Sequence, residues 1–326
     1  DWVALQQLLW LVEGSNAIET KVVEFQYGAN YILSKPLFLP TKTGTLNSSY
    51  KAFAINGNNS MLQSLGGTRR KLISLFVPCQ NYADGIQGSL PKFIFDKIAF
   101  KQPYKPTRDT NPLTQSAGLV VTGYQAEIKS CYFIGGDIGI DCQFGLQTHI
   151  QDCICENQNL FGIAIRTGQW FNAGVTNSQS NGTVVDTVKF RLQDQRLITD
   201  GQAQYAAIYI AGSSDCDVRN IIFEGGVEGV VIERCYYGLV FDALYNNTVV
   251  KDFSLYNVHL EKSFQYYAFQ IRAYGDSHNY IGKVTLIATQ SFNKILDFGA
   301  GPVINASGVQ ANMTGTPHAI LERFPY

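Results

Sequence analysis

The sequence predicts an all-β protein, built as a parallel β-helix (a solenoid of stacked coils) behind a single N-terminal helix. Helical spacing of apolar residues occurs at the start of the chain, and short β-type runs separated by Gly, Asn, Asp and Ser follow it. Those runs recur in two families of similar pattern. A repeat of about 20 to 50 residues made of strand and turn is typical of a solenoid, in which each coil buries its apolar face against its neighbours.

The helix is predicted from the opening segment "VALQQLLWLVEG". Leu5, Leu8, Leu9 and Val12 recur at helical spacing, and Gly14 follows as a stop signal. We therefore expect one amphipathic helix within residues 1–16, placed as a cap on the coil.

The two families of repeats predict the strands. The first family starts with a small or turn residue, followed by an apolar, any, apolar pattern; its copies begin at residues 118, 137, 162, 207, 229, 238 and 268. The second reads apolar, two polar, apolar, any, apolar or Cys; its copies are 128–133, 150–155, 185–190, 218–223 and 250–255. Stacked coils would place Ile128 over Ile150 and Cys131 over Cys153. Because "GVVIER" and "GLVFDA" start only nine residues apart, one of them is expected on another face.

A β-sandwich is the rival architecture. It would need antiparallel pairs joined by hairpin turns such as Asn-Gly. That dipeptide occurs at 56–57 and 181–182, and only once between plausible strands. The two-family repeat therefore favours the parallel solenoid, with loops inserted at 167–182 and 193–206.

Composition excludes some partners and leaves others open. The 326 residues carry a net charge of −1 and have no run of eighteen apolar residues, so we expect no nucleic-acid partner and no membrane insertion. Aromatic residues make up 13% of the chain and charged residues only 16%. Such a surface suits sugar rings, although aromatic side chains also fill cores and subunit interfaces.

The seven cysteines show no CxxC pair and no zinc-type spacing with His. We expect free thiols that act as small buried apolar groups. No metal and no cofactor is predicted.

The stretch "VVEFQYGANYILSKPLFLP" (22–40), followed by "KAFAINGNN" (51–59), resembles the start of pectate-lyase-like right-handed β-helix proteins. Within that family the likeness is closer to phage tailspikes and related receptor-binding proteins. Gln26 and Tyr27 depart from the family, which usually has proline just before the turn glycine. The residues that carry the resemblance are Phe25, Gly28, Tyr31, Ile32, Ser34, Pro36, Leu37, Leu39, Pro40, Ile55 and Gly57.

The resemblance implies a single-stranded right-handed parallel β-helix over residues 17–290, capped by the helix at 1–16. Residues 291–326 would form a C-terminal cap or lead into a further domain. It also implies a homotrimer in a virion tail or surface spike that contacts other virion proteins and binds, or also depolymerises, a cell-surface polysaccharide. Without an initiator Met, the chain looks like a fragment or a processed product.

Two other functions remain open at this point. One is a non-catalytic structural β-helix of a virion, whose aromatic surface serves assembly. The other is a secreted, extracellular polysaccharide-degrading enzyme that acts as a monomer.

Catalytic candidates come from the need of glycoside hydrolysis for two carboxylates about 5 to 10 Å apart. Residues i and i+2 of a strand share a face about 7 Å apart, so Asp215 with Asp217, and His259 with Glu261, are candidate acid–base pairs. Aspartates in a turn can instead cap backbone amides, and His259 and Glu261 can instead lie on a solvated strand face.

Candidate substrate-binding residues are Trp170 and Phe171, in the inserted loop beside the repeats, and Arg166. The alternative for the two aromatic residues is packing under the loop. The alternative for Arg166 is a surface ion pair with Asp141, one coil away, of little energetic weight. No "DxxxD" run followed by "RxPxxR" appears, which argues against pectate-lyase chemistry.

Overall fold

The computed structural model describes the backbone of part of the chain, and after Ile222 it describes backbone alone. The described residues are 1–14, 21–39, 52–65, 71–75, 92–103, 115–166, 180–192, 204–211, 213–214, 216–225, 235–242, 244–245, 248–249, 254–261, 264–272, 279–281, 284–288, 294–298, 304–305, 309–313 and 322–323.

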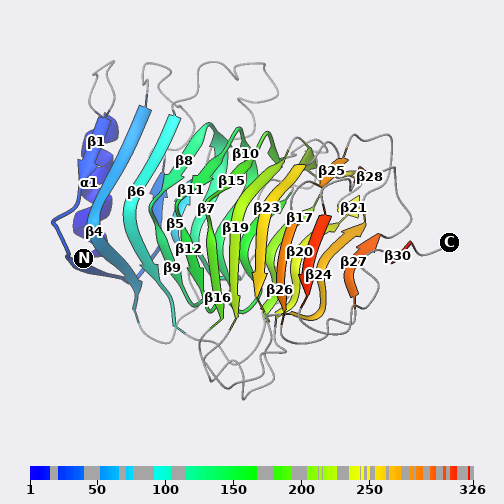
Figure 1. Ribbon diagram of the computed structural model, residues 1–326. Helices are drawn as coiled ribbons and strands as arrows, with labels where there is room; N and C mark the ends of the chain where they lie inside the picture. The colour runs from blue at the N-terminus through cyan, green and yellow to red at the C-terminus, as the bar shows by residue number, and fades with distance from the viewer. Residues whose placement is uncertain are drawn as a thin grey trace.

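The predicted helix is present as α1 (Trp2–Gly14) and lies at the N-terminal end of the stacked strands (Figure 1). Leu5 and Leu9 are buried, whereas Leu8 is 38% exposed, so the apolar face is narrower than the spacing suggests. The indole of Trp2 donates to the Pro36 carbonyl oxygen at 2.8 Å, and the Lys21 ammonium donates to the Val12 carbonyl oxygen at 2.8 Å. These bonds fix the helix to the first coil. No helix in the described part of the chain is long and apolar enough to cross a membrane.

The strands form a parallel β-helix with two large sheets, as Figure 1 shows. The parallel pairing rules out the sandwich. The long sheet has 16 strands: β1 (Lys21–Glu24), β2 (Asn30–Leu33), β4 (Ala52–Ser64), β6 (Lys92–Lys101), β8 (Ala126–Lys129), β9 (Tyr132–Ile134), β11 (His149–Gln151), β12 (Ile154–Glu156), β15 (Val184–Asp186), β16 (Lys189–Leu192), β19 (Asp217–Gly225), β23 (Ser254–Glu261), β25 (Asn279–Ile281), β26 (Val284–Ala288), β28 (Ile304–Asn305) and β29 (Val309–Met313).

The second sheet has 10 strands, one per coil: β3 (Leu37–Leu39), β5 (Lys71–Leu75), β7 (Ala117–Tyr124), β10 (Ile138–Leu146), β13 (Phe161–Arg166), β17 (Gln204–Ala211), β20 (Cys235–Asp242), β24 (Phe264–Arg272), β27 (Lys294–Phe298) and β30 (Glu322–Arg323). Two small pairs complete the set: β14 (Ser180–Asn181) with β18 (Ser213–Ser214), and the antiparallel β21 (Leu244–Tyr245) with β22 (Thr248–Val249). Strands β27 to β30 extend both large sheets beyond residue 290, and where a domain boundary lies stays a prediction.

Five successive coils of the long sheet, from β6 to β19, each bend at one residue in the left-handed conformation. The bend residues Lys97, Ser130, Asp152, Thr187 and Asn220 have φ between 51° and 55°. The bend divides the exterior of the long sheet into two half-faces, one before and one after it.

The backbone register confirms the second family of repeats and corrects its last copy. Ile128 pairs with Ile150, and Val185 pairs with Val218, as predicted. Val218, however, pairs with Leu255, so the last copy is "LYNVHL" at 255–260 and the prediction of 250–255 is wrong. A copy that the sequence reasoning missed, "FDKIAF" at 95–100, precedes the others and pairs with 128–133.

Copies of the first family begin with a small residue because the two sheets pack closely together at that position. Leu119, Ile140, Ile163 and Ile208 share one register row, so the residues before them also form a row, Gly118, Gly139, Gly162 and Ala207. A Cβ on Gly162 would meet Phe190 Cε1 at 2.5 Å. The copy predicted at 137–142 therefore begins two residues too early. "GLVFDA" lies in β20 of this sheet, and "GVVIER" lies outside the described residues.

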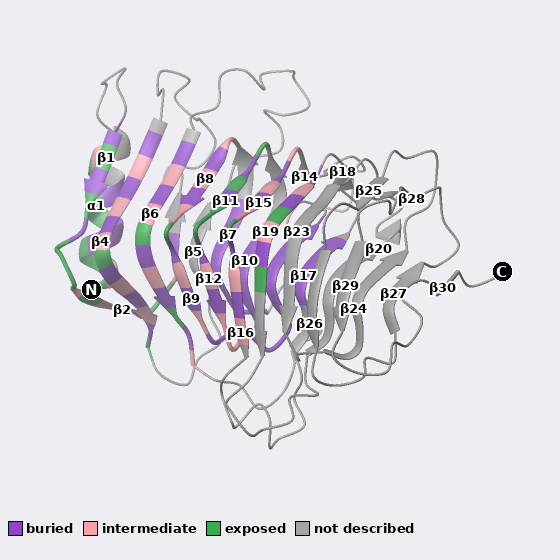
Figure 2. Cartoon of the chain, viewed as in Figure 1, coloured by how far each residue is buried: buried purple, intermediate pink, exposed green. Residues whose placement is uncertain are grey.

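The buried residues run along the interior of the coil (Figure 2). In register, like residues lie over one another, as Ile128 does over Ile150. Phe100 stacks on Phe133 of the next coil with ring centroids 4.7 Å apart. Five of the seven cysteines have described side chains; all five are buried free thiols, as predicted. Burial raises the pKa of the Cys131 thiol, which lies against Cys153 as expected, so the Cys131 thiol stays protonated.

Candidate functional site

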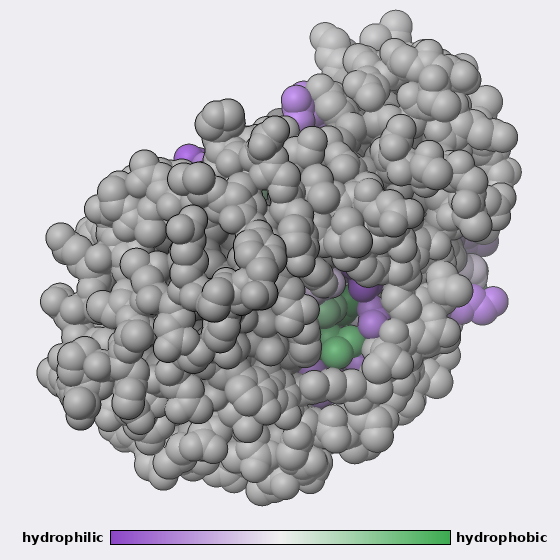
Figure 3. Space-filling view, turned by 90° about the vertical axis from the view of Figure 1, so that its right-hand side faces the viewer, coloured by the Kyte–Doolittle hydropathy of each residue, from purple (hydrophilic) through white to green (hydrophobic). Residues whose placement is uncertain are grey.

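The outer faces of the two sheets differ in exposure. On the second sheet, outward positions form an apolar cluster that is itself buried, including Val120, Ala164 and Tyr209. On the long sheet, outward positions before and after the bend are partly or fully exposed (Figure 2). Figure 3 also shows a hollow at which described hydrophobic and hydrophilic residues lie next to each other. Of the two sheets, the long sheet is therefore the one whose described outward side chains solvent can reach.

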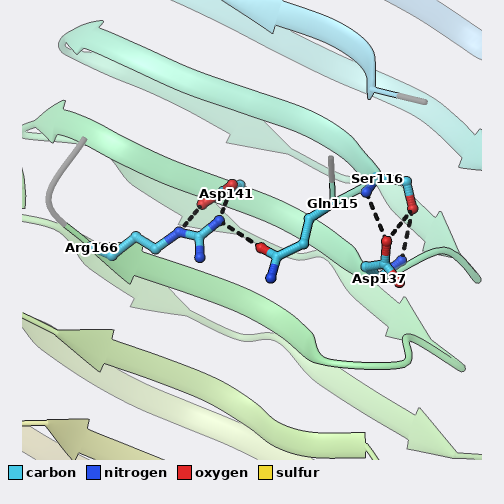
Figure 4. A network of polar contacts seen from close by, with 5 residues as sticks. All are labelled: Gln115, Ser116, Asp137, Asp141 and Arg166. Atoms are coloured by element: carbon cyan, nitrogen blue, oxygen red, sulfur yellow. Dashed lines mark hydrogen bonds and ion pairs between the residues drawn. The ribbon is translucent and has the colours of Figure 1, made fainter. Parts of the chain in front are cut away.

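A network of polar side chains is buried on the outer side of the second sheet (Figure 4). Arg166 on β13 donates from Nε to Asp141 Oδ1 at 2.9 Å and from its terminal nitrogen to Oδ2 at 2.7 Å. The same terminal nitrogen donates to the Gln115 side-chain oxygen at 3.0 Å. Beside it, the backbone amide and hydroxyl of Ser116 both donate to Asp137 Oδ2, at 2.8 and 3.0 Å.

Arg166 lies one coil from Asp141, as predicted, but the alternative that the two form a surface ion pair is wrong. The side chains of Arg166 and Asp141 are only 4% and 1% exposed. Asp141 lies between Val120 and Ala164 in its register row, and the aromatic rings of Phe161 and Tyr209 stack nearby at 4.6 Å. Apolar neighbours shield the charges of Arg166 and Asp141 from water, so the two hydrogen bonds of the ion pair replace the lost hydration.

One group of partly exposed charges lies on the half-face before the bend. Arg219 on β19 donates from Nε to Asp186 Oδ2 at 2.9 Å and contacts Asp217 Oδ2 at 3.2 Å. Asp186 belongs to β15 of the preceding coil, where it faces Arg219 in register. The structure thus brings two carboxylates to one guanidinium whose side chain is 45% exposed.

Asp186 is held as an anion. Burial alone raises its pKa, but hydrogen bonds from the Asn220 amide at 2.7 Å, the Thr187 hydroxyl at 2.9 Å and Arg219, together with the Arg219 charge, lower the pKa below its ordinary value. Thr187 and Asn220 are bend residues of successive coils. The bend of the backbone therefore supplies the donors that fix Asp186, and Asp186 in turn fixes Arg219.

Two chemical uses fit this arrangement. Asp186 and Asp217 contact the same guanidinium, which keeps them within the roughly 5 to 10 Å that glycoside hydrolysis uses. An acid catalyst, however, needs a raised pKa, and the neighbouring Arg219 cation favours the charged carboxylate instead. The cluster is better suited to hold a guanidinium in a fixed orientation, ready to bind hydroxyl or anionic groups of a ligand.

A row of polar side chains extends from this cluster along the coil axis. Asp96, Lys129, Gln151, Asp186 and Arg219 pair in register on five successive coils, and all are partly or fully exposed. Neighbouring coils are about 4.8 Å apart, so the row is about 19 Å long. We call these five residues the axial row.

Of the predicted catalytic residues, the structure places Asp217 in a charged cluster, with Asp186 as its carboxylate neighbour. Cys216 is buried while Asp217 is half-exposed, which agrees with the predicted alternation. His259 and Glu261 lie on β23, where His259 pairs with Ile222 and therefore sits five positions from the level of Asp217, beyond the bend. Asp215, Trp170 and Phe171 lie outside the described residues, and the predicted roles of these residues stay predictions.

Sequence reasoning missed Asp186 and Arg219. A signal for them existed: aligning "VDTVKF" (185–190) with "VRNIIF" (218–223) puts Asp186 beside Arg219. The search for carboxylate pairs within one strand passed over partners on neighbouring coils. The described residues hold no group of three His, Cys, Asp or Glu side chains that could bind a metal ion.

Comparison with known proteins supports the fold. No protein-family model matches the chain, and no curated protein matches it either. Among solved structures, an alginate lyase from Paenibacillus sp. str. FPU-7 is 14% identical with a TM-score of 0.54, covering 95% of this chain and 94% of its own. The Dettilon tailspike protein is 12% identical with a TM-score of 0.43, covering 95% of this chain and 57% of its own. An endo-xylogalacturonan hydrolase from Aspergillus tubingensis is 11% identical with a TM-score of 0.32, covering 90% of this chain and 86% of its own. The chain is similar in architecture to β-helix proteins, and the alginate lyase extends that likeness over nearly the whole of both chains.

Proposed function

We propose that this chain is the β-helix of a viral tailspike or fibre, and that it binds a polysaccharide of the host cell surface along the exterior of its long sheet. The tailspike part of the proposal is supported by the resemblance of residues 22–59 to the openings of such proteins. The polysaccharide part is supported by the likeness in fold to an alginate lyase.

The axial row is the observation that carries the proposal. A linear polymer laid along the coil axis would meet a polar side chain at each of five successive coils. The row includes two carboxylates, one ammonium group, one amide and the fixed guanidinium of Arg219, which together match the hydroxyl groups of sugars. Repetition at the spacing of the coils suits a repeating ligand better than a compact one.

Cleavage of the bound chain is a separate question, because the Arg219 cation suits Asp217 and Asp186 to binding better than to acid catalysis. The test is incubation with a panel of bacterial surface polysaccharides, followed by mass spectrometry. Discrete oligosaccharides would establish an endo-acting enzyme; products that gain the mass of water would indicate hydrolysis, and mass-neutral products with an unsaturated end would indicate a lyase.

Binding is tested separately with Arg219→Gln, which keeps a polar group but removes the charge. We expect this variant to bind about tenfold or more weakly to the polysaccharide that the wild-type chain binds. The reason is that a charge-assisted hydrogen bond contributes roughly 1.5 to 3 kcal/mol. The control is Lys35→Gln, which removes a positive charge near α1, over the Trp2 ring. Unchanged affinity in Arg219→Gln would exclude the axial row, and no binding to any glycan would favour a structural virion component.

The proposal also includes a homotrimer. Light scattering of the purified chain tests it, and a monomeric mass would instead favour a polysaccharide-degrading enzyme that acts alone.

A further inference from the structure

A second polar cluster lies on the other half-face of the long sheet, after the bend. Tyr132 on β9, Glu156 on β12 and Arg191 on β16 belong to three successive coils. Arg191 lies five residues after Asp186 on the same coil, with the bend residue Thr187 between them. The two clusters therefore face different directions.

Hydrogen bonds fix the carboxylate of Glu156 in this second cluster. The Tyr132 hydroxyl donates to Glu156 Oε2, and the Asn157 amide donates to Oε1 at 3.3 Å. Glu156 lies directly opposite Arg191 in the register of β12 and β16. All three side chains are partly exposed, unlike the buried network around Arg166, so a ligand can reach them.

The phenol of Tyr132 remains a hydrogen-bond donor over the physiological pH range. Partial burial, followed by the hydrogen bond to Glu156 and its negative charge, raises the pKa of Tyr132 to about 12, although Arg191 opposes the shift. The cluster thus offers an aromatic ring, a fixed acceptor and a cationic donor within three coils.

We propose that Tyr132, Glu156 and Arg191 form a second glycan-binding site, separate from the axial row, that holds a pyranose unit of the same polysaccharide. An aromatic ring supplies apolar surface for the face of a sugar ring, while a carboxylate and a guanidinium supply an acceptor and donors for its hydroxyl groups. The Glu156 charge disfavours a phosphate or other compact anion. This inference rests on the proposed function.

The test measures affinity for the polysaccharide that the wild-type chain retains from the bacterial panel. Tyr132→Ala, Glu156→Gln and Arg191→Gln should each weaken binding about fivefold or more, as expected for the loss of a hydrogen bond or ring contact. Tyr132→Phe keeps the packing of the ring and removes the hydroxyl alone, so it reports on binding even if Tyr132→Ala fails to fold. The matched control is Tyr27→Ala, since Tyr27 is 78% exposed near the N-terminal end of the coil.

The outcomes separate this inference from the proposed function. If Arg219→Gln weakens binding while the Tyr132, Glu156 and Arg191 variants bind like wild type, the second site is wrong and the axial row stands. If losses from Arg219→Gln and Glu156→Gln multiply in the double variant, both sites contact the glycan independently. If the folded wild-type chain binds no member of the panel, both proposals are overturned.

Discussion

The buried ion pair of Arg166 and Asp141 makes a sharp prediction about stability. Arg166→Met keeps most of the side-chain volume but leaves the Asp141 carboxylate, 1% exposed, without the guanidinium that contacts both of its oxygens. Breaking a buried pair by removing one partner costs about 3 to 5 kcal/mol. Because domains are typically stable by about 5 to 15 kcal/mol, the loss would be a large part of the total.

Two further variants test whether burial of the ion pair causes this loss of stability. The double variant Asp141→Leu with Arg166→Met should recover most of the loss, because Asp141 lies between Val120 and Ala164 and an apolar residue suits that position. Arg219→Met, which breaks an ion pair whose arginine side chain is 45% exposed, should cost about 1 kcal/mol or less.

The assay is urea-induced unfolding followed by circular dichroism; if unfolding is irreversible, rates of unfolding should show the same order. A loss below about 1 kcal/mol in Arg166→Met would refute the claim that burial makes this pair matter. So would a double variant no more stable than the single one. Glycan binding by the folded Arg166→Met variant then tests the predicted role of Arg166 in substrate binding: we expect it to be unchanged, because Arg166 is 3% exposed.

Three other predictions concern single residues. Gly162→Ala should lower the free energy of unfolding by about 1 to 3 kcal/mol, because the new Cβ would lie 2.5 Å from the Phe190 ring and 2.8 Å from the Ala207 carbonyl oxygen; a urea midpoint equal to wild type would contradict this close packing. The lowered pKa of Asp186 means that its contribution to stability is present above its unfolded-state pKa near 4 and is lost as pH falls through its folded-state pKa. Unfolding curves of wild type and Asp186→Asn should therefore differ at neutral pH and converge in acid. A difference that persists unchanged in acid would count against this linkage. The pKa of Tyr132, raised from 10.0 to about 12, gives stability that is present below pH 10 and lost as pH rises toward 12. In an ultraviolet titration, the signal that Tyr132→Phe loses should lie near pH 12, and a lost signal near pH 10 would exclude the raised pKa.

Much of the fold could be predicted from local sequence patterns. Apolar and polar residues alternate with a period of two on either side of the bend, so a copy such as "IQDCIC" shows which positions face the core once the bend residue Asp152 is allowed for. Stacking of coils then follows, because copies with the same pattern bury the same positions. The small residue before each strand of the second sheet was visible as well, although its cause, the close approach of Phe190 to Gly162, was not.

The sequence by itself determined the solenoid of parallel coils, the capping helix and the buried free cysteines, because each depends on residues close together in the chain. The tertiary structure alone decided which residues on different coils become neighbours. Asp217 is a carboxylate partner of Asp186 through Arg219, and that contact depends on the register between residues 33 apart in the sequence. The tertiary structure also decided that Arg166 and Asp141 are buried, because the exposure of an outward-facing position depends on what lies over the sheet and not on the strand that carries it.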